Sequence, residues 1–261
     1  MTIAVGIDIG GTGIKGAVVD TATGELLTSR IKVPTPEGGE PDAIVATVTQ
    51  ILATLAVEPG IPVGVCFPAV VINGTTMSAA NVSDKWIGLA AESLFEQALG
   101  RDIHFVNDAD AAGYAEVRYG AAKGVKGLVI LTTLGTGIGS ALIYNDVLIP
   151  NSELGHLELD GKDAESRAAY SAKERDDLDW AHWAKRLQKY YTHLESLFSP
   201  DLFIVGGGVS KTADDFLPLL KLDTPIIAAV HKNNAGILGA AALAAPRPAS
   251  APSVEFPTDS E

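Results

Sequence analysis

The four residues GTGI occur twice in the sequence, at 11–14 and at 135–138, each time between apolar runs. Each copy predicts a β-hairpin with glycines at its turn, where glycine tolerates positive φ and lets backbone N–H groups approach a phosphate closely. One glycine turn of this kind is weak evidence, but two indicate related domains that offer amides to one shared polyanion. The residues predicted to contact phosphate at the two turns are Gly10, Gly11, Thr12, Gly13, Lys15, Thr132, Gly135, Thr136 and Gly137.

A carboxylate, Asp8, stands just before the first turn. A carboxylate next to phosphate is electrostatically unfavourable unless a cation lies between them, so Asp8 predicts a Mg²⁺ ion held directly or through water. The alternative is an aspartate that only stabilises the turn. Lys15, just after the turn, offers a point charge for a terminal phosphate, and its alternative is a solvated lysine on a strand.

Asp108 follows an apolar strand and precedes a helix, in the segment HFVNDAD. Partial burial at that place would raise its proton affinity, which suits a general base that accepts a proton from an alcohol. The alternative is that Asp108 is the N-cap of the helix, a position that aspartate favours. The spacing leaves both interpretations open, and one side chain can have both roles.

Glu153 and His156 are three residues apart in the segment ELGH, a spacing that could suit a metal ion. A tetrahedral thiolate site for zinc needs several cysteines. The chain has a single cysteine, Cys66, in an apolar run, and the segment 157–180 has none. We therefore expect no structural zinc, and we expect Cys66 to be an inert residue of the core.

The predicted elements would bring these clusters together. Residues 3–33 predict a three-stranded antiparallel meander, and helices and strands then alternate as far as residue 122. A strand-hairpin-strand pattern begins again at Leu128, and a long helical region, a strand and a helix follow it at 164–198, 201–208 and 233–245. In α/β domains ligands gather at the carboxyl ends of strands. The polar clusters that follow strands are Asp8, Asn107 with Asp108, residues 132–139 and residues 206–208.

The composition sets limits on the class of protein. The 261 residues are 47% hydrophobic and 20% charged, enough for one large or two modest domains. A net charge of −13 argues against a duplex nucleic acid as partner. The sequence has no basic-then-apolar leader and no run of membrane-spanning length, so we expect a soluble, cytoplasmic protein without a membrane partner. Residues 246–261 are rich in proline, serine and acids and predict a disordered tail.

Several long motifs in a fixed order resemble the ROK family of sugar kinases: DIGGTGIKGA, NDADAAGYAE, LTTLGTGIGSALI, NSELGHLE and IVGGGVS. The segments AANVSDKWIG and LESLFSPDLFIVGGGVSKTADDF narrow the resemblance to polyphosphate glucokinases of actinobacteria. The resemblance extends to about Ala245. It implies an α/β protein with the actin-like ATPase fold, in which two homologous, ribonuclease H-like domains, at 1–107 and 108–245, enclose a cleft. It also implies that the final helix, 234–245, packs back on the first domain, and that the protein is a homodimer.

The resemblance also implies an activity: transfer of a phosphoryl group from inorganic polyphosphate, and from ATP, to the 6-hydroxyl of glucose with Mg²⁺ present. It assigns the catalytic base to Asp108. It assigns sugar hydroxyls to Asn81, Asn107, Asp108, Glu153 and His156. Glu165 would fill the place of a later sugar-binding glutamate, although it could equally be a solvated acid at a helix start. Gly207 and Gly208 would lie where a nucleotide rests.

Two other functions fit the same resemblance. One is a strictly ATP-dependent ROK hexose or amino-sugar kinase. The other is a non-enzymatic, sugar-responsive regulator of ROK type, which we disfavour because the phosphate strand begins at Ile3 and leaves no room for a DNA-binding unit.

A polyphosphate donor needs an extended run of positively charged side chains. The candidates for this run are Arg118, Lys123, Lys126, Lys185 and Lys189, although these could also be ordinary solvated lysines and arginines.

Overall fold

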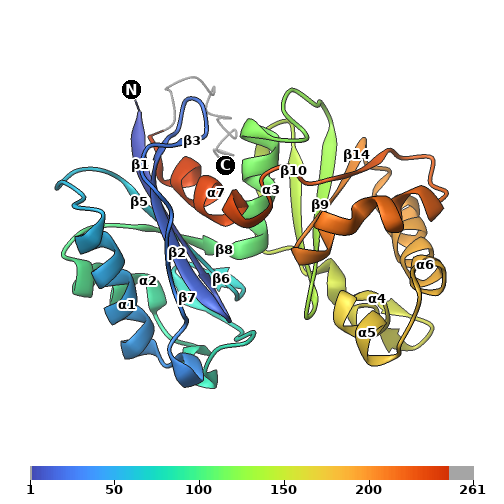
Figure 1. Cartoon of the computed structure of the whole chain (residues 1–261), viewed down its shortest axis with the longest axis horizontal. Helices are drawn as coiled ribbons and strands as arrows, with labels where there is room; N and C mark the ends of the chain where they lie inside the picture. The colour runs from blue at the N-terminus through green and yellow to red at the C-terminus, as the bar shows by residue number, and fades with distance from the viewer. Residues whose placement is uncertain (1, 247–261) are drawn as a thin grey trace, which may run out of the picture.

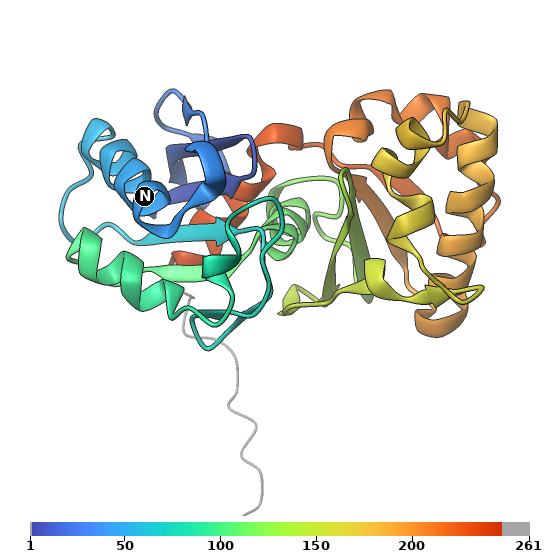
Figure 2. The same cartoon turned by 90° about the horizontal axis from the view of Figure 1, so that it is seen from below.

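The computed structural model describes residues 2–246, so the predicted tail lies outside the described residues apart from Pro246. Two β-sheets stand side by side, each with helices against it (Figure 1). The two halves are also separate when the molecule is seen from below (Figure 2). Within residues 2–246, no helix combines the length and the apolar character that crossing a membrane requires.

The first sheet has the strand order β3-β2-β1-β5-β8, and β4 also pairs with β2. Its strands are β1 (Ile3–Gly10), β2 (Gly13–Asp20), β3 (Glu25–Leu26), β4 (Ile31–Val33), β5 (Val63–Phe67) and β8 (His104–Asn107). β1 and β2 are antiparallel, whereas β5 and β8 run parallel to β1, so their carboxyl ends lie at the edge that carries the β1–β2 turn. The predicted third strand of the meander is in fact two short strands, β3 and β4, that both pair with β2.

Helices α1 (Pro41–Thr54) and α2 (Ala91–Leu99) cover the outer face of this sheet (Figure 1). Alternate residues of β1 explain the arrangement, because Val5, Ile7 and Ile9 point toward apolar residues of α1. Two short strands, β6 (Val71–Ile72) and β7 (Thr75–Thr76), form a hairpin after β5 that the sequence did not predict.

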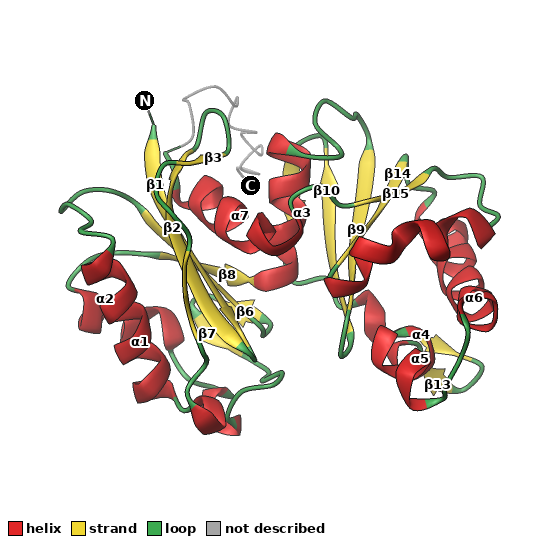
Figure 3. Cartoon of the chain, viewed as in Figure 1, coloured by secondary structure: helices red, strands yellow, loops and turns green. Residues whose placement is uncertain are grey.

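The second sheet has the order β11-β10-β9-β14-β15. Its strands are β9 (Leu128–Leu134), β10 (Ile138–Tyr144), β11 (Val147–Ile149), β14 (Leu202–Gly206) and β15 (Ile226–Ala228). Its outer face packs on α6 (Trp180–Phe198), beside α4 (Glu165–Ala168) and α5 (Tyr170–Arg175) (Figure 3). The long helix predicted over 164–198 is therefore three helices. It breaks before α6 because Asp177 is left-handed (φ 46°) and Asp179 caps α6 by accepting a bond from the His182 amide (2.7 Å).

Two helices, α3 (Asp108–Tyr119) and α7 (Ala235–Ala244), lie between the sheets (Figure 1). α7 rests directly on β1 and β5, because an added Cβ at Gly6 or at Gly64 would lie 1.9 Å from a carbonyl oxygen of α7. The C-terminal helix therefore packs against the sheet formed by the start of the chain.

The remaining elements are short. A two-stranded hairpin, β12 (Glu158–Leu159) and β13 (Lys162–Asp163), precedes α4. The 3₁₀ segments are Glu37–Gly39, Asp84–Trp86, Leu154–His156, Gly208–Asp215, Leu217–Leu219 and Lys232–Asn234.

Candidate active site

The two GTGI segments form similar turns at equivalent places in the two sheets. β1 and β2 are joined by Gly11 and Thr12, and β9 and β10 are joined by residues 135–137. The predicted need for positive φ is wrong, because no glycine of either turn has a left-handed φ, whereas the predicted approach of backbone N–H groups to phosphate stays a prediction. The glycines leave room for neighbouring side chains instead. An added Cβ would lie 2.7 Å from Asn81 at Gly11, and 2.4 Å from Glu165 at Gly137.

A cavity of about 550 Å³ lies at the carboxyl ends of β8 and β9. One wall comes from the loop after β5, another from the second glycine turn, and a third from the segment after β11. Its lining residues are Pro68, Ala69, Ser78, Ala79, Ala80, Asn81, Asn107, Asp108, Thr133, Gly135, Thr136, Gly137, Ile138, Gly139, Glu153, His156, Glu165 and Gly207.

The cavity brings together every residue predicted to bind sugar: Asn81, Asn107, Asp108, Glu153, His156 and Glu165. Of the residues predicted to bind phosphate it includes Gly135, Thr136, Gly137 and Gly207. The others lie outside its lining: Asp8, Gly10, Gly11, Thr12, Gly13, Lys15, Thr132 and Gly208. The first turn nevertheless borders the cavity, since Gly11 packs against the cavity residue Asn81.

Thr132 needs a correction. Its side chain is fully buried, and its hydroxyl lies 2.6 Å from the hydroxyl of Tyr191 on α6. Thr132 shares the face of β9 with Ile130 and Leu134, which pack on α6, so its side chain points away from the cavity. The next residue, Thr133, faces the cavity instead.

The alternative role of Asp108, as the N-cap of the helix that follows it, is not what the structure shows. The N-cap of α3 is Asn107, whose Oδ1 accepts hydrogen bonds from the amides of Ala109 (2.8 Å) and Asp110 (3.0 Å). Its Nδ2 donates to the carbonyl of Ala69 (3.0 Å), so one N–H of this side chain is left for a ligand. Asp108 is not needed as the cap, and its carboxyl group is available to the cavity.

The environment of Asp108 changes its proton affinity. Burial and, to a smaller extent, the negative charge of Asp8 raise the pKa of this carboxyl group to about 7, although a hydrogen bond from the Ala109 amide lowers it. A carboxylate with a pKa near neutrality combines a useful ionised fraction with enough basicity to accept a proton.

Asp8 lies at the start of the first turn, in contact with three different groups. Its Oδ2 accepts a hydrogen bond from Lys15 Nζ (2.7 Å), its Oδ1 lies 3.8 Å from the Cys66 thiol, and Gly236 of α7 leaves space for it. Burial raises the pKa of Cys66 well above its usual value, so the thiol stays protonated. One carboxylate of this kind fits Mg²⁺, which proteins commonly hold by one or two carboxylates together with phosphate oxygens and water.

The segment that carries Glu153 and His156 is fixed by neighbouring side chains. Ser140 Oγ accepts a hydrogen bond from the Leu154 amide (2.9 Å). His156 Nδ1 lies 2.8 Å from Asp163 Oδ2, and this hydrogen bond raises the pKa of His156. Asp163 was missed by the sequence analysis. The sequence feature that could have pointed to Asp163 is its position seven residues after His156, at the end of the β12–β13 hairpin, which reverses the chain.

Glu165 connects the third wall of the cavity to the second glycine turn. Its Oε2 accepts a hydrogen bond from the Ile138 amide (2.9 Å). Ligand atoms of His156, Asp163 and Glu165 lie within 4.8 Å of one another, a grouping without thiolates. Glu165 therefore lines the cavity and also binds the backbone directly after the second glycine turn.

Two of the candidate polyphosphate lysines are already paired with carboxylates. Lys126 lies 3.8 Å from Asp146, and Lys189 pairs with Asp160. A polyphosphate chain that used these lysines would have to displace those partners.

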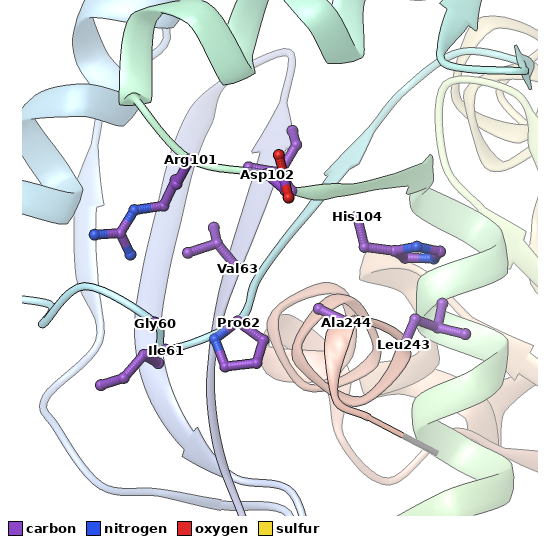
Figure 4. A pocket seen from close by; sticks show the side chains of 10 residues that line it. Gly60, Ile61, Pro62, Val63, Arg101, Asp102, His104, Leu243 and Ala244 are labelled. Carbon is purple, nitrogen blue, oxygen red and sulfur yellow. The ribbon is translucent and has the colours of Figure 1, made fainter.

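A second cavity, of about 460 Å³, lies at the amino ends of β5 and β8, the opposite edge of the first sheet from the glycine turn (Figure 4). Arg101 and Asp102 line it, together with Leu243 and Ala244 of α7. No residue of the predicted site lies there.

Two sheets with equivalent glycine turns, a helix pair between them and an aspartate at the shared edge define an α/β protein of the actin-like ATPase fold. The chain belongs to the ROK family, whose model matches residues 4–169. The predicted fold class and family are thereby confirmed.

Relatives and solved structures agree with this assignment. The chain is 48% identical over 237 residues to a polyphosphate glucokinase of Mycobacterium tuberculosis, covering 90% of this chain and 89% of that one. It is 52% identical to the inorganic polyphosphate/ATP-glucomannokinase of Arthrobacter sp. strain KM, with a TM-score of 0.87 and coverage of 92% and 97%. A ROK family glucokinase from Streptomyces griseus, solved with glucose and AMPPNP, is 26% identical, with a TM-score of 0.79 and coverage of 93% and 99%.

Proposed function

We propose that this protein is a glucokinase that transfers a phosphoryl group from inorganic polyphosphate or ATP to the 6-hydroxyl of glucose. The observation that carries the proposal is the cavity itself. It brings Asp108, with a pKa of about 7, together with polar side chains that could bind hydroxyl groups and with the second glycine turn. The activities of the Mycobacterium and Arthrobacter relatives support the same donor and the same class of acceptor.

The sugar would be bound by the polar side chains around the cavity. Each hydroxyl group of a pyranose can donate one hydrogen bond and accept others, which suits a mixture of amides, carboxylates and an imidazole. We assign this role to Asn81, Asn107, Glu153, His156 and Glu165. Asp108 accepts the proton of the 6-hydroxyl as that oxygen attacks the phosphorus atom.

The phosphate chain would be bound by the two glycine turns. Amides of residues 135–137 and 10–13 would bond to phosphate oxygens, with Thr12 and Thr136 adding hydroxyl groups and Lys15 a positive charge. Asp8 would hold Mg²⁺, which would neutralise part of the charge on the donor. Gly207 and Gly208 would lie beside the far end of a nucleotide donor.

The family resemblance also leads us to propose a homodimer located in the cytoplasm. Light scattering of the purified protein tests the homodimer, and cell fractionation tests the location.

We also propose that the boundary between the two domains lies between residues 107 and 108, where α3 begins.

A matrix of donors and acceptors tests the proposed function. Purified protein is incubated with Mg²⁺, with polyphosphate or ATP as donor and with glucose, mannose or an amino sugar as acceptor, and the sugar 6-phosphate is measured. We expect glucose 6-phosphate from both donors. Product from ATP alone would support the strictly ATP-dependent kinase instead, and no product from any pair would refute kinase activity.

A further inference from the structure

Three residues that are far apart in the sequence form a hydrogen-bonded bridge beside the cavity. The amide of Asn151 donates to Oδ2 of Asp110 on α3 (2.7 Å). The side chain of Asn151 makes two bonds to the backbone of Val71 on β6, accepting from its amide (2.8 Å) and donating to its carbonyl (2.7 Å). We call these three residues the Asn151 bridge. It links the β6–β7 hairpin, which belongs to the first half of the chain, to α3 and to the segment after β11.

Each member of the bridge stands two residues away from a residue of the cavity. Asp110 follows Asp108 on α3, and Asn151 precedes Glu153 in the segment after β11. Val71 follows Ala69, whose carbonyl accepts the bond from Asn107. The bridge therefore joins two walls of the cavity, the loop after β5 and the segment after β11, to the first turn of α3, which carries Asp108.

Two local features of the bridge are uncommon, the backbone of Asn151 and the burial of Asp110. Asn151 has a left-handed backbone (φ 60°), which asparagine tolerates better than most residues. In this conformation its amide reaches Asp110 while its side chain reaches Val71. Asp110 is fully buried, and its Oδ1 has no hydrogen-bond partner within residues 2–246. A buried carboxyl group with an unpartnered oxygen reduces stability, so this aspartate is a poor choice for packing alone.

We infer that Asn151 and Asp110 are positioning residues that hold Glu153 at a fixed place relative to Asp108, so that the bound sugar presents its 6-hydroxyl to the base. This inference rests on the proposed function. The bridge also ties the two halves of the chain together at the sugar end of the cavity. Any closure of the two domains must then leave the distance between Val71 and Asn151 almost unchanged.

The first test replaces Asn151 and compares it with a matched control. Asn151→Ala removes both bonds to Val71, and we expect the KM for glucose to rise about 10- to 30-fold, from two hydrogen bonds of ordinary strength. The KM for polyphosphate should change by less than about threefold, because the donor contacts are elsewhere. The control is Asn145→Ala. Asn145 is also left-handed (φ 47°) and also accepts a backbone bond, from the Gly127 amide (2.9 Å), but no residue within two positions of it lines the cavity, whereas Asn151 stands two residues before Glu153.

A positioning role and a merely structural role give different results. The inference requires that the control variant, Asn145→Ala, lower the melting temperature without raising the KM for glucose. Any of three results would overturn the inference: an unchanged KM for glucose in Asn151→Ala, an equal rise in its KM values for glucose and polyphosphate, or an equal rise of the KM for glucose in the control.

A second test compares a conservative and a non-conservative replacement of Asp110. Asp110→Asn keeps an oxygen that can accept from the Asn151 amide and should keep the KM for glucose near that of the unchanged protein, whereas Asp110→Ala should raise it.

Hydrogen exchange separates this inference from the proposed function. The Val71 amide should exchange slowly in the unchanged protein and faster in Asn151→Ala, whatever sugar the protein phosphorylates. Fast exchange at Val71 in the unchanged protein would show that the bridge does not form. Failure to phosphorylate glucose with a protected Val71 amide would instead refute the proposed function and leave the bridge in place.

Discussion

Replacement of Asp108 with asparagine removes one function and leaves its surroundings intact. Asparagine has the shape of aspartate but does not accept the proton of an alcohol at neutral pH. The helix should be unaffected, because its cap is Asn107 and not Asp108. We therefore expect Asp108→Asn to fold and to bind glucose, but to lose turnover.

The size of the loss follows from the role of the group. A well-placed general base contributes about 10²- to 10⁴-fold to the rate, so kcat should fall by a factor in this range. The pKa of about 7 adds a pH dependence with a definite sign, because only the ionised form accepts a proton. In the unchanged protein, kcat/KM should rise about tenfold between pH 5 and pH 6 and level off above pH 7. In Asp108→Asn that rise should disappear.

The assay couples glucose 6-phosphate formation to NADP⁺ reduction, with polyphosphate and ATP as separate donors. Glucose binding is measured in parallel by calorimetry. A loss of less than tenfold, or a pH profile with the same rise in the variant, would refute Asp108 as the base. Loss of glucose binding together with turnover would show that Asp108 holds the sugar.

Three further predictions concern stability and donor binding. Burial raises the pKa of Asp110 to about 7, so the folded state binds a proton that the unfolded state releases near pH 4. The free energy of unfolding should therefore fall by on the order of 4 kcal/mol between pH 4 and pH 7 from this group alone, and urea titrations of Asp110→Asn should lack that fall. Gly6→Ala should destabilise the fold by about 3 kcal/mol or more, because its Cβ would collide with α7, whereas Gly208→Ala meets no atom within 4 Å and should unfold at nearly the original temperature. Lys15→Gln should raise the KM for both donors about 10- to 100-fold and leave the KM for glucose unchanged, and a rise for glucose instead would contradict its assignment to phosphate.

The residues that the sequence predicted well are those whose position follows from the strand order. Asn107 ends a parallel strand and Asp108 follows it directly, and the two glycine turns occupy equivalent places in two sheets, so the strand pattern alone was enough to expect a shared edge. The residues predicted to bind sugar came from the family resemblance, and the structure gathers all of them around one cavity.

What the sequence did not reveal depends on which way a side chain faces or on contacts between distant segments. Thr132 and Thr133 are neighbours of the same type, and only the packing of α6 decides which of them faces the cavity. The cap role of Asn107 rather than Asp108 depends on a single residue of register at the helix start. The Asn151 bridge joins residues 80 and 41 positions apart, and no local pattern encodes it.

The structure of the protein with glucose and a non-hydrolysable phosphate donor tests the central claim most directly, through the distance from the Asp108 carboxylate to the sugar 6-hydroxyl oxygen. We predict about 2.6 to 3.2 Å, with the terminal phosphate on the other side of that oxygen, between the two glycine turns. A glucose molecule whose 6-hydroxyl points away from Asp108, or a phosphate chain bound outside the turns, would contradict the account.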